Sequence, residues 1–129
     1  MILGIGVDIL SIGRIEAVVR RGPGYTARFA RRILCDRELC EFKDVVAKQG
    51  EAAQTKYLAT RWCLKEAVYK AAYPHQTLRW NDVRVYKNGP KPAMHVDWRP
   101  EWQGVCTHAS LSHDEGLVIG YVVVEKGSA

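Results

Sequence analysis

The longest helical pattern in the chain constrains the fold more than any other feature. It runs from about Gln54 to Ala72, where the tripeptide YPH ends it. Apolar residues recur in it at helical spacing and cover a broad arc of the helix surface: Tyr57, Leu58, Trp62, Leu64, Val68, Tyr69, Ala71 and Ala72. A helix with so wide an apolar arc has to pack against a second layer of structure.

The segment before this helix predicts one strand and three shorter helices. The sequence MILGIGVDIL alternates, with Leu3, Ile5, Val7 and Ile9 on a crowded face and Ile2, Gly4, Gly6 and Asp8 on an open one. Ser11 is suited to cap a helix that ends at Arg20, and RGPGY then breaks the chain. Two further helices are expected in TARFARRIL and in CDRELCEFKDVVAKQ, the latter with Asp36 as its N-cap.

In the segment after the long helix, the pattern of apolar residues changes to a period of two. DVRVYK and AMHVDW flank the turn NGPKP, and GVCTHASLSH and LVIGYVVVE flank the turn DEG, so two hairpins are expected. The chain therefore predicts an α+β fold, in which an antiparallel sheet packs on the long helix. Its 129 residues suit one domain, 1–129.

Composition limits the classes of protein to which the chain can belong. Four scattered cysteines (Cys35, Cys40, Cys63 and Cys106) form no CxxC pair, which favours reduced thiols in an intracellular protein. A net charge of +5 favours an anionic partner. Neither a signal peptide nor a membrane span is predicted, and we expect the cytoplasm or the mitochondrion as the compartment.

Charged residues interrupt the apolar arc of the long helix. Arg61 and Lys65 fall near its middle, Glu66 lies on its rim, and Lys70 follows one turn later. A cation on a buried stripe is unfavourable unless an anion pairs with it. One interpretation is a structural network with a Glu66–Lys70 surface pair. The other is one side of a binding site.

Two further features bear on this choice. Asp8 is a carboxylate beside two glycines, so it either caps the following turn or binds a hard metal such as Mg²⁺ with Glu66 as second ligand. In SLSHDEG, Ser110, Ser112 and His113 either bind phosphate or complete a hairpin. Two carboxylates, several cations and Ser/His donors together suit phosphoryl or pyrophosphate chemistry. The sequence contains neither a P-loop nor a nucleophile elbow.

Three motifs carry a resemblance to a known family. GIGVDILSIGRIE, RWCLKEAVYKA and SLSHD occur in this order, with an RFAxRIL element and an NG…KP turn between them. The chain thereby resembles, over nearly its whole length, the short holo-acyl-carrier-protein synthases, a class of 4′-phosphopantetheinyl transferases. The segment YPHQTLRW is closer to fungal than to bacterial members.

The resemblance implies an activity and a set of site residues. The enzyme would transfer the phosphopantetheine arm of coenzyme A to a serine of an acyl carrier protein and release 3′,5′-ADP. Asp8 and Glu66 match the family's Mg²⁺ ligands, and Glu66 would remove the serine proton directly or through a metal-bound water. Lys70 would stabilise the pyrophosphate or protonate the leaving group. The residues that match coenzyme A contacts are Arg61, Lys65, Gly89, Lys91, Pro92, Ser112 and His113.

The resemblance also implies partners. Acyl carrier proteins are acidic, and Arg14 matches the family's docking arginine. Arg28, Arg31 and Arg32 on the next helix would extend this basic surface and raise the association rate. Short-class members form homotrimers with sites between subunits.

Two other classes of function compete with this one. A basic nucleic-acid-binding module is suggested by the arginines, but the chain lacks the signatures of such modules, so no nucleic acid is expected. A catalytically inactive scaffold is disfavoured by the intact Asp8, Lys65 and Glu66.

Overall fold

A computed structural model describes residues 1–127 of the chain. The elements follow one another as β1 (Ile2–Ser11), α1 (Ile12–Arg20), α2 (Pro23–Ile33), α3 (Asp36–Lys48), α4 (Glu51–Ala72), η1 (Trp80–Asp82), β2 (Val83–Asn88), β3 (Lys91–Val96), η2 (Pro100–Trp102), β4 (Val105–Asp114) and β5 (Leu117–Lys126). Strands β1, β5 and β4 form an antiparallel sheet in that order, and β2 and β3 form a separate antiparallel hairpin. The predicted α+β class is confirmed.

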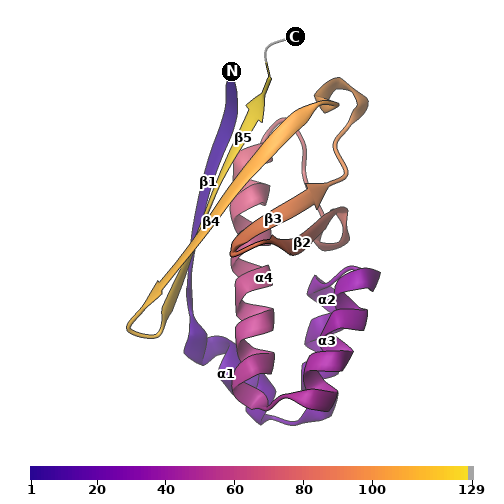
Figure 1. Cartoon of the computed structure of the whole chain (residues 1–129), viewed down its shortest axis with the longest axis vertical. Coiled ribbons are helices and arrows are strands. Elements are labelled where there is room, and N and C mark those ends of the chain that lie inside the picture. The colour runs from indigo at the N-terminus through magenta and orange to yellow at the C-terminus, as the bar shows by residue number, and fades with distance from the viewer. Residues whose placement is uncertain (128–129) are drawn as a thin grey trace.

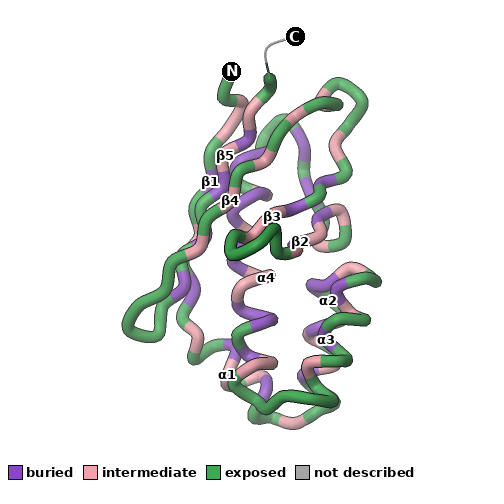
Figure 2. The backbone as a smooth tube through the Cα atoms, viewed as in Figure 1, coloured by how far each residue is buried: buried purple, intermediate pink, exposed green. Residues whose placement is uncertain are grey.

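Helix α4 is the centre of the molecule. It lies lengthwise against the three-stranded sheet, while α2 and α3 lie on its other side and the β2–β3 hairpin lies beside its middle (Figure 1). Its buried residues contribute to two apolar clusters. One cluster joins α4 to the three shorter helices, and the other joins it to the hairpin and to β5. The helix is accordingly buried along most of its length (Figure 2).

The two glycines of β1 allow the strand to approach α4 closely. A Cβ atom at Gly4 or Gly6 would clash with the backbone oxygen of Ala71 or Ala67. The open face of the strand therefore packs on the helix, and the space beside the glycines is taken by another backbone. The crowded face is turned outward, where Ile5, Val7 and Ile9 remain 58%, 51% and 59% exposed.

Several predicted details differ from the structure. The β1–β5 register shifts between Ile2 and Gly4, and Leu3 is partly buried against the second cluster instead of sharing the exposure of Ile5. Helix α3 begins at Asp36 with Cys35 as its N-cap, so the prediction of Asp36 as the cap is wrong by one residue. The cause is Glu38, whose Oε1 accepts a hydrogen bond of 2.9 Å from the Cys35 backbone nitrogen.

Two further expectations concern thiols and membranes. The cysteines are free thiols, and only Cys63 is fully buried. Within residues 1–127, no helix combines the length and the apolar character that crossing a bilayer requires.

Candidate active site

Strand β1 and helix α4 bring together Asp8, Glu66 and Lys70. The Lys70 ammonium donates to Asp8 Oδ1 and to the Val7 backbone oxygen, each at 3.0 Å. Partial burial raises the pKa of Glu66, the nearby Asp8 carboxylate raises it further, and Lys70 opposes both effects. We call this set of residues, Asp8, Glu66 and Lys70, the open cluster, because the Lys70 side chain is 51% exposed.

The donor set of the open cluster fits a hard divalent cation. Across residues 1–127, no group of three or more His, Cys, Asp or Glu side chains is placed to hold a metal. Asp8 and Glu66 thus form a site with only two carboxylates. These two repel each other, and Lys70 is the cation that compensates their charge. Mg²⁺ is commonly bound by one or two carboxylates, with water and phosphate oxygens as its other ligands. These residues can hold Mg²⁺ on that basis.

Cys63 lies beneath the open cluster as an inert thiol. Its Sγ lies within hydrogen-bond distance of two acceptors, the Asp8 backbone oxygen at 3.3 Å and the Val118 backbone oxygen at 3.7 Å. Burial, followed by the nearby Asp8 carboxylate, raises its pKa to about 12. The thiol therefore supports β1 and β5 and is protonated at neutral pH.

A first cavity of about 650 Å³ lies at the N-terminal half of α4. Arg61, Pro92, Ser112 and His113, four of the residues predicted to contact coenzyme A, are among its lining. The β2–β3 hairpin and α1 supply other parts of its wall. The structure thus gathers residues from three distant parts of the sequence at one cavity.

Arg61 has an unused donor beside this cavity. Its guanidinium lies 3.7 Å from the centre of the Tyr57 ring, and Nη1 donates to Thr60 Oγ1 at 3.1 Å. Its Nε is buried and has no hydrogen-bond partner among residues 1–127. A buried donor without an acceptor is unfavourable, so an anionic ligand would stabilise this side chain.

The predicted coenzyme A contacts differ in where their side chains point and in whether they reach the first cavity. Ser112 pairs across the sheet with Ile119, and His113 pairs with the buried Val118, so the two side chains leave β4 on opposite faces. Gly89 in the hairpin turn and Lys91 at the start of β3 are exposed and lie outside the cavity lining, which Pro90 and Pro92 reach instead. The additional proline of this sequence is thus itself part of the wall.

Lys65 does not fit the predicted role of phosphate ligand. Its side chain is 1% exposed, and its ammonium forms an ion pair with Glu38, whose side chain is 0% exposed. Burial lowers the pKa of Lys65, while Glu38 opposes this shift. The ammonium is enclosed and its three donors are already bonded inside the protein, so none remains for a phosphate, although Lys65 and Glu66 line the same cavity.

A second cavity of about 920 Å³ lies between the end of α2, the start of α3 and η1. Glu66 lines it together with Arg31 and Arg32, two of the predicted docking arginines. Arg28 lies instead beside Tyr25, 5.8 Å from the ring centre, and Arg14 is exposed on α1. The predicted docking arginines are therefore all at the surface, and two of them share a cavity with Glu66.

The sequence interpretation missed residues at both cavities. Lys56 and Lys87 add cations to the first cavity, and Arg79 adds one to the second. The position of Lys87 next to the NGPKP turn was a usable signal. Glu38 was missed entirely, because nothing in its local sequence shows that a residue of α3 reaches Lys65.

Comparison with known proteins identifies the family of the chain. A family model described as the 4′-phosphopantetheinyl transferase superfamily matches residues 4–122. A Leptothrix cholodnii holo-acyl-carrier-protein synthase is 38% identical over 135 residues, with 97% of each chain covered. A Schizosaccharomyces pombe protein that carries the same name provisionally is 32% identical over 123 residues, with 91% of each covered.

Solved structures of this kind share the fold. The Neisseria meningitidis holo-acyl-carrier-protein synthase superposes with a TM-score of 0.74 at 32% identity and covers 98% of this chain and 100% of its own. The Bacillus anthracis enzyme, solved with coenzyme A (3′,5′-ADP), superposes with a TM-score of 0.75 at 27% identity, covering 98% and 99%. The chain belongs to the 4′-phosphopantetheinyl transferase superfamily.

Proposed function

We propose that this protein transfers the 4′-phosphopantetheine arm of coenzyme A to a serine of an apo-acyl carrier protein and releases 3′,5′-ADP. The observation that carries the proposal is the meeting of Asp8, Glu66 and Lys70 from two separate motifs. The arrangement has two carboxylates for a cation and one ammonium for phosphate charge. Relatives named holo-acyl-carrier-protein synthase match 97% of the chain, which supports the same activity.

Glu66 is the group proposed to accept the serine proton. The serine Oγ attacks the phosphorus atom next to the pantetheine arm, and a new P–O bond forms. The bond from that phosphorus to the bridging oxygen breaks, and the electron pair leaves with 3′,5′-ADP. A raised pKa brings a carboxylate closer to the working pH of a general base, which suits Glu66 to this step.

Coenzyme A is proposed to place its phosphates near Arg61, with Lys70 as a second cation. The unpartnered Nε of Arg61 at the first cavity supports the first assignment. Mg²⁺, held by Asp8 and Glu66, would neutralise developing charge on the pyrophosphate. The Lys70 ammonium, which otherwise neutralises Asp8, would then be available to the leaving group.

The carrier protein is proposed to dock on Arg14, Arg28, Arg31 and Arg32. All four are exposed, and an acidic partner helix would meet them with complementary charge. Reversing the charge with Arg14→Glu should raise the KM for the carrier protein while the KM for coenzyme A stays the same. An unchanged carrier KM would remove Arg14 from the docking surface.

The exposed face of the sheet is proposed to join three copies of the chain. Ile5, Val7 and Ile9 of β1 lie beside Ile119 and Tyr121 of β5, and all are at least 40% exposed. A continuous apolar surface of this kind is typical of an interface. Val7→Lys should shift the sedimentation coefficient to that of a monomer, whereas Thr77→Lys, at another exposed site, should not. A wild-type chain that sediments as a monomer would refute the assembly.

The function is tested by incubating the protein with coenzyme A, Mg²⁺ and an apo-carrier protein. The expected result is a mass gain of one phosphopantetheine arm on the carrier, absent when a chelator removes Mg²⁺. Binding of RNA without any affinity for coenzyme A would favour the nucleic-acid-binding alternative instead.

A further inference from the structure

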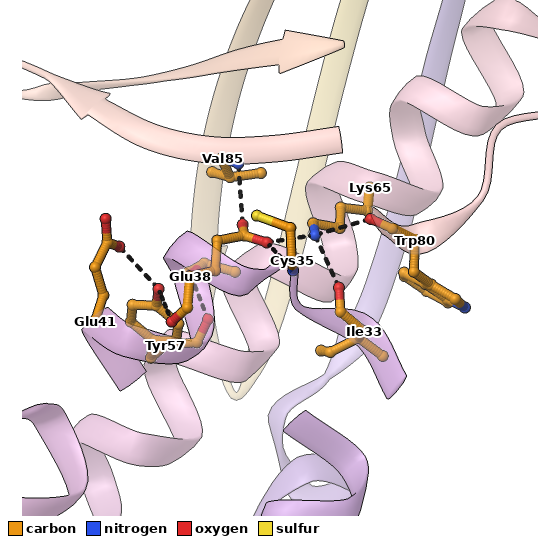
Figure 3. A network of polar contacts seen from close by, with 9 residues as sticks. Ile33, Cys35, Glu38, Glu41, Tyr57, Lys65, Trp80 and Val85 are labelled. Atoms are coloured by element: carbon orange, nitrogen blue, oxygen red, sulfur yellow. Dashed lines mark hydrogen bonds and ion pairs between the residues drawn. The ribbon is translucent and has the colours of Figure 1, made fainter. Parts of the chain in front are cut away.

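Glu38 and Lys65 form a polar network that the proposed mechanism does not use. Figure 3 shows the Lys65 ammonium among oxygen atoms that come from three other segments. It donates to Glu38 Oε1, to the Ile33 backbone oxygen at 2.8 Å and to the Trp80 backbone oxygen at 3.0 Å. An ammonium has three N–H donors, so each of them is matched by one acceptor.

Both oxygens of the Glu38 carboxylate are also hydrogen-bonded inside the protein. Oε1 accepts from Lys65 and from the Cys35 backbone nitrogen, and Oε2 accepts from the Val85 backbone nitrogen at 3.0 Å. The pair thereby joins α4 to the end of α2, the start of α3, η1 and β2. Apart from the ion pair and the local cap at Cys35, these bonds go to backbone groups of other segments, namely Ile33, Trp80 and Val85.

The network lies between the two cavities. Val85 lines the first cavity, and its backbone is held by Glu38. Cys35 and Trp80 line the second cavity, and their backbones are held by Glu38 and Lys65. Lys65 also precedes Glu66 on the same helix. One buried ion pair thus connects the walls of both cavities to the helix that carries the proposed base.

We propose that Glu38 and Lys65 are positioning residues, which hold the β2–β3 hairpin and the α2–α3 junction at fixed places relative to Glu66. The inference rests on the proposed function, because it assigns coenzyme A to the first cavity. A fully bonded buried network restricts its members to one arrangement, and a displacement of about 1 Å in a positioning group can reduce a rate about 100-fold.

A purely stabilising role explains this pair less well. Taking two charges out of water is unfavourable, and well-packed apolar residues often replace a buried ion pair without loss of stability. An apolar pair could not bond the Val85, Cys35, Ile33 and Trp80 backbones at once. The chemistry of the pair is therefore suited to fixing the geometry of the walls.

The test compares two substitutions of Glu38 with a control in the core. Glu38→Ala removes all the acceptors, and Glu38→Gln keeps the size and one acceptor. Val124→Ala opens a cavity at a fully buried residue of β5 that lines neither of the two cavities. The affinity for coenzyme A is measured by titration calorimetry without carrier protein. The kcat, both KM values and the Tm are measured alongside, at a temperature where every variant is folded.

We expect Glu38→Gln to weaken coenzyme A binding about tenfold and to lower kcat by a similar factor, with Glu38→Ala showing a larger effect. Val124→Ala should lower the Tm yet leave the affinity for coenzyme A within about twofold of the wild type. If Glu38→Ala does not fold, the comparison of Glu38→Gln with Val124→Ala is sufficient to test the inference.

Two results would overturn the inference. One is a Glu38→Gln variant that binds coenzyme A and turns over like the wild type. The other is a loss of affinity in Val124→Ala as large as that in Glu38→Gln at equal Tm, because the effect would then follow stability alone. A wild-type protein that binds no coenzyme A would refute the proposed function itself, which is a distinct outcome.

Discussion

Two neighbouring residues of α4, Lys65 and Glu66, have opposite surroundings. Lys65 belongs to a closed cluster with Glu38, in which the ammonium donors and both carboxylate oxygens are already bonded inside the protein. Glu66 belongs to the open cluster with Asp8 and the half-exposed Lys70. The difference shows that charge on a buried-looking helix has two separate uses. A buried pair whose atoms are bonded inside the protein is suited to fixing structure, whereas carboxylates that repel each other near solvent can receive a cation and a proton.

The largest expected effect is on catalysis by the open cluster. Asp8→Asn or Glu66→Gln should lower the transfer rate by about 10³-fold or more, because each removes a proposed metal ligand and Glu66→Gln also removes the base. The measurement is the initial rate of carrier modification, with circular dichroism to show that the fold is retained. Full activity in either variant would contradict the assignment of the open cluster as the site.

The next effect is on the stability of the closed cluster. Lys65→Met should lower the free energy of unfolding by about 3–5 kcal/mol, because it leaves the Glu38 carboxylate buried without its cation. Denaturant unfolding measures this value. A loss below about 1 kcal/mol, as for a surface pair, would show that water reaches the Glu38–Lys65 pair in solution.

Lys70→Met is the matched substitution in the open cluster. Its side chain is half-exposed, so the free energy of unfolding should fall by less than about 1 kcal/mol. The transfer rate should nevertheless fall about 10- to 100-fold, since the substitution removes a cation proposed to act on the leaving group. A stability loss as large as that of Lys65→Met would erase the distinction between the two clusters.

The smallest effect is a change in the pH dependence of stability. The raised pKa of Glu66 means that the folded protein holds this proton more tightly than the unfolded chain. The favourable contribution is complete at low pH and is lost as the pH rises through the folded pKa. Glu66→Gln should therefore raise the Tm slightly at pH 8 without Mg²⁺, and the gain should vanish near pH 4, where the wild-type carboxyl is protonated. An equal or lower Tm at pH 8 would contradict the burial of this carboxylate.

The sequence was sufficient for the element order, because the change from a period of 3.6 to a period of two falls after Ala72, where the long helix ends. It also indicated that a cation at Lys65 would need an anion. The identity of that anion was beyond reach. Phosphate and Glu38 satisfy the same electrostatic requirement, and only the tertiary fold brings α3 to α4.

The alternation in β1 had a similar limit. A period of two separates two faces but does not say which of them is covered. The glycine face lies on α4, and the apolar face with Val7 is exposed. Asp8 was found because it shares the face of Gly4 and Gly6. The divergence of Ser112 and His113 follows from the same alternation, because consecutive residues of a strand point to opposite faces.

The contact between β1 and α4 also relates the spacing of residues along the strand to the spacing of residues along the helix. Gly4 meets Ala71, Gly6 meets Ala67, and the Asp8 backbone meets Cys63. Two strand residues advance by about 6.8 Å and four helix residues by about 6 Å, so the two repeats run nearly in step. A deletion of one residue in β1 would turn Asp8 to the other face, and a deletion of two would move it by about one helical turn. The distance between the Asp8 and Glu66 carboxylates is therefore determined by the number of residues that precede them along β1 and α4.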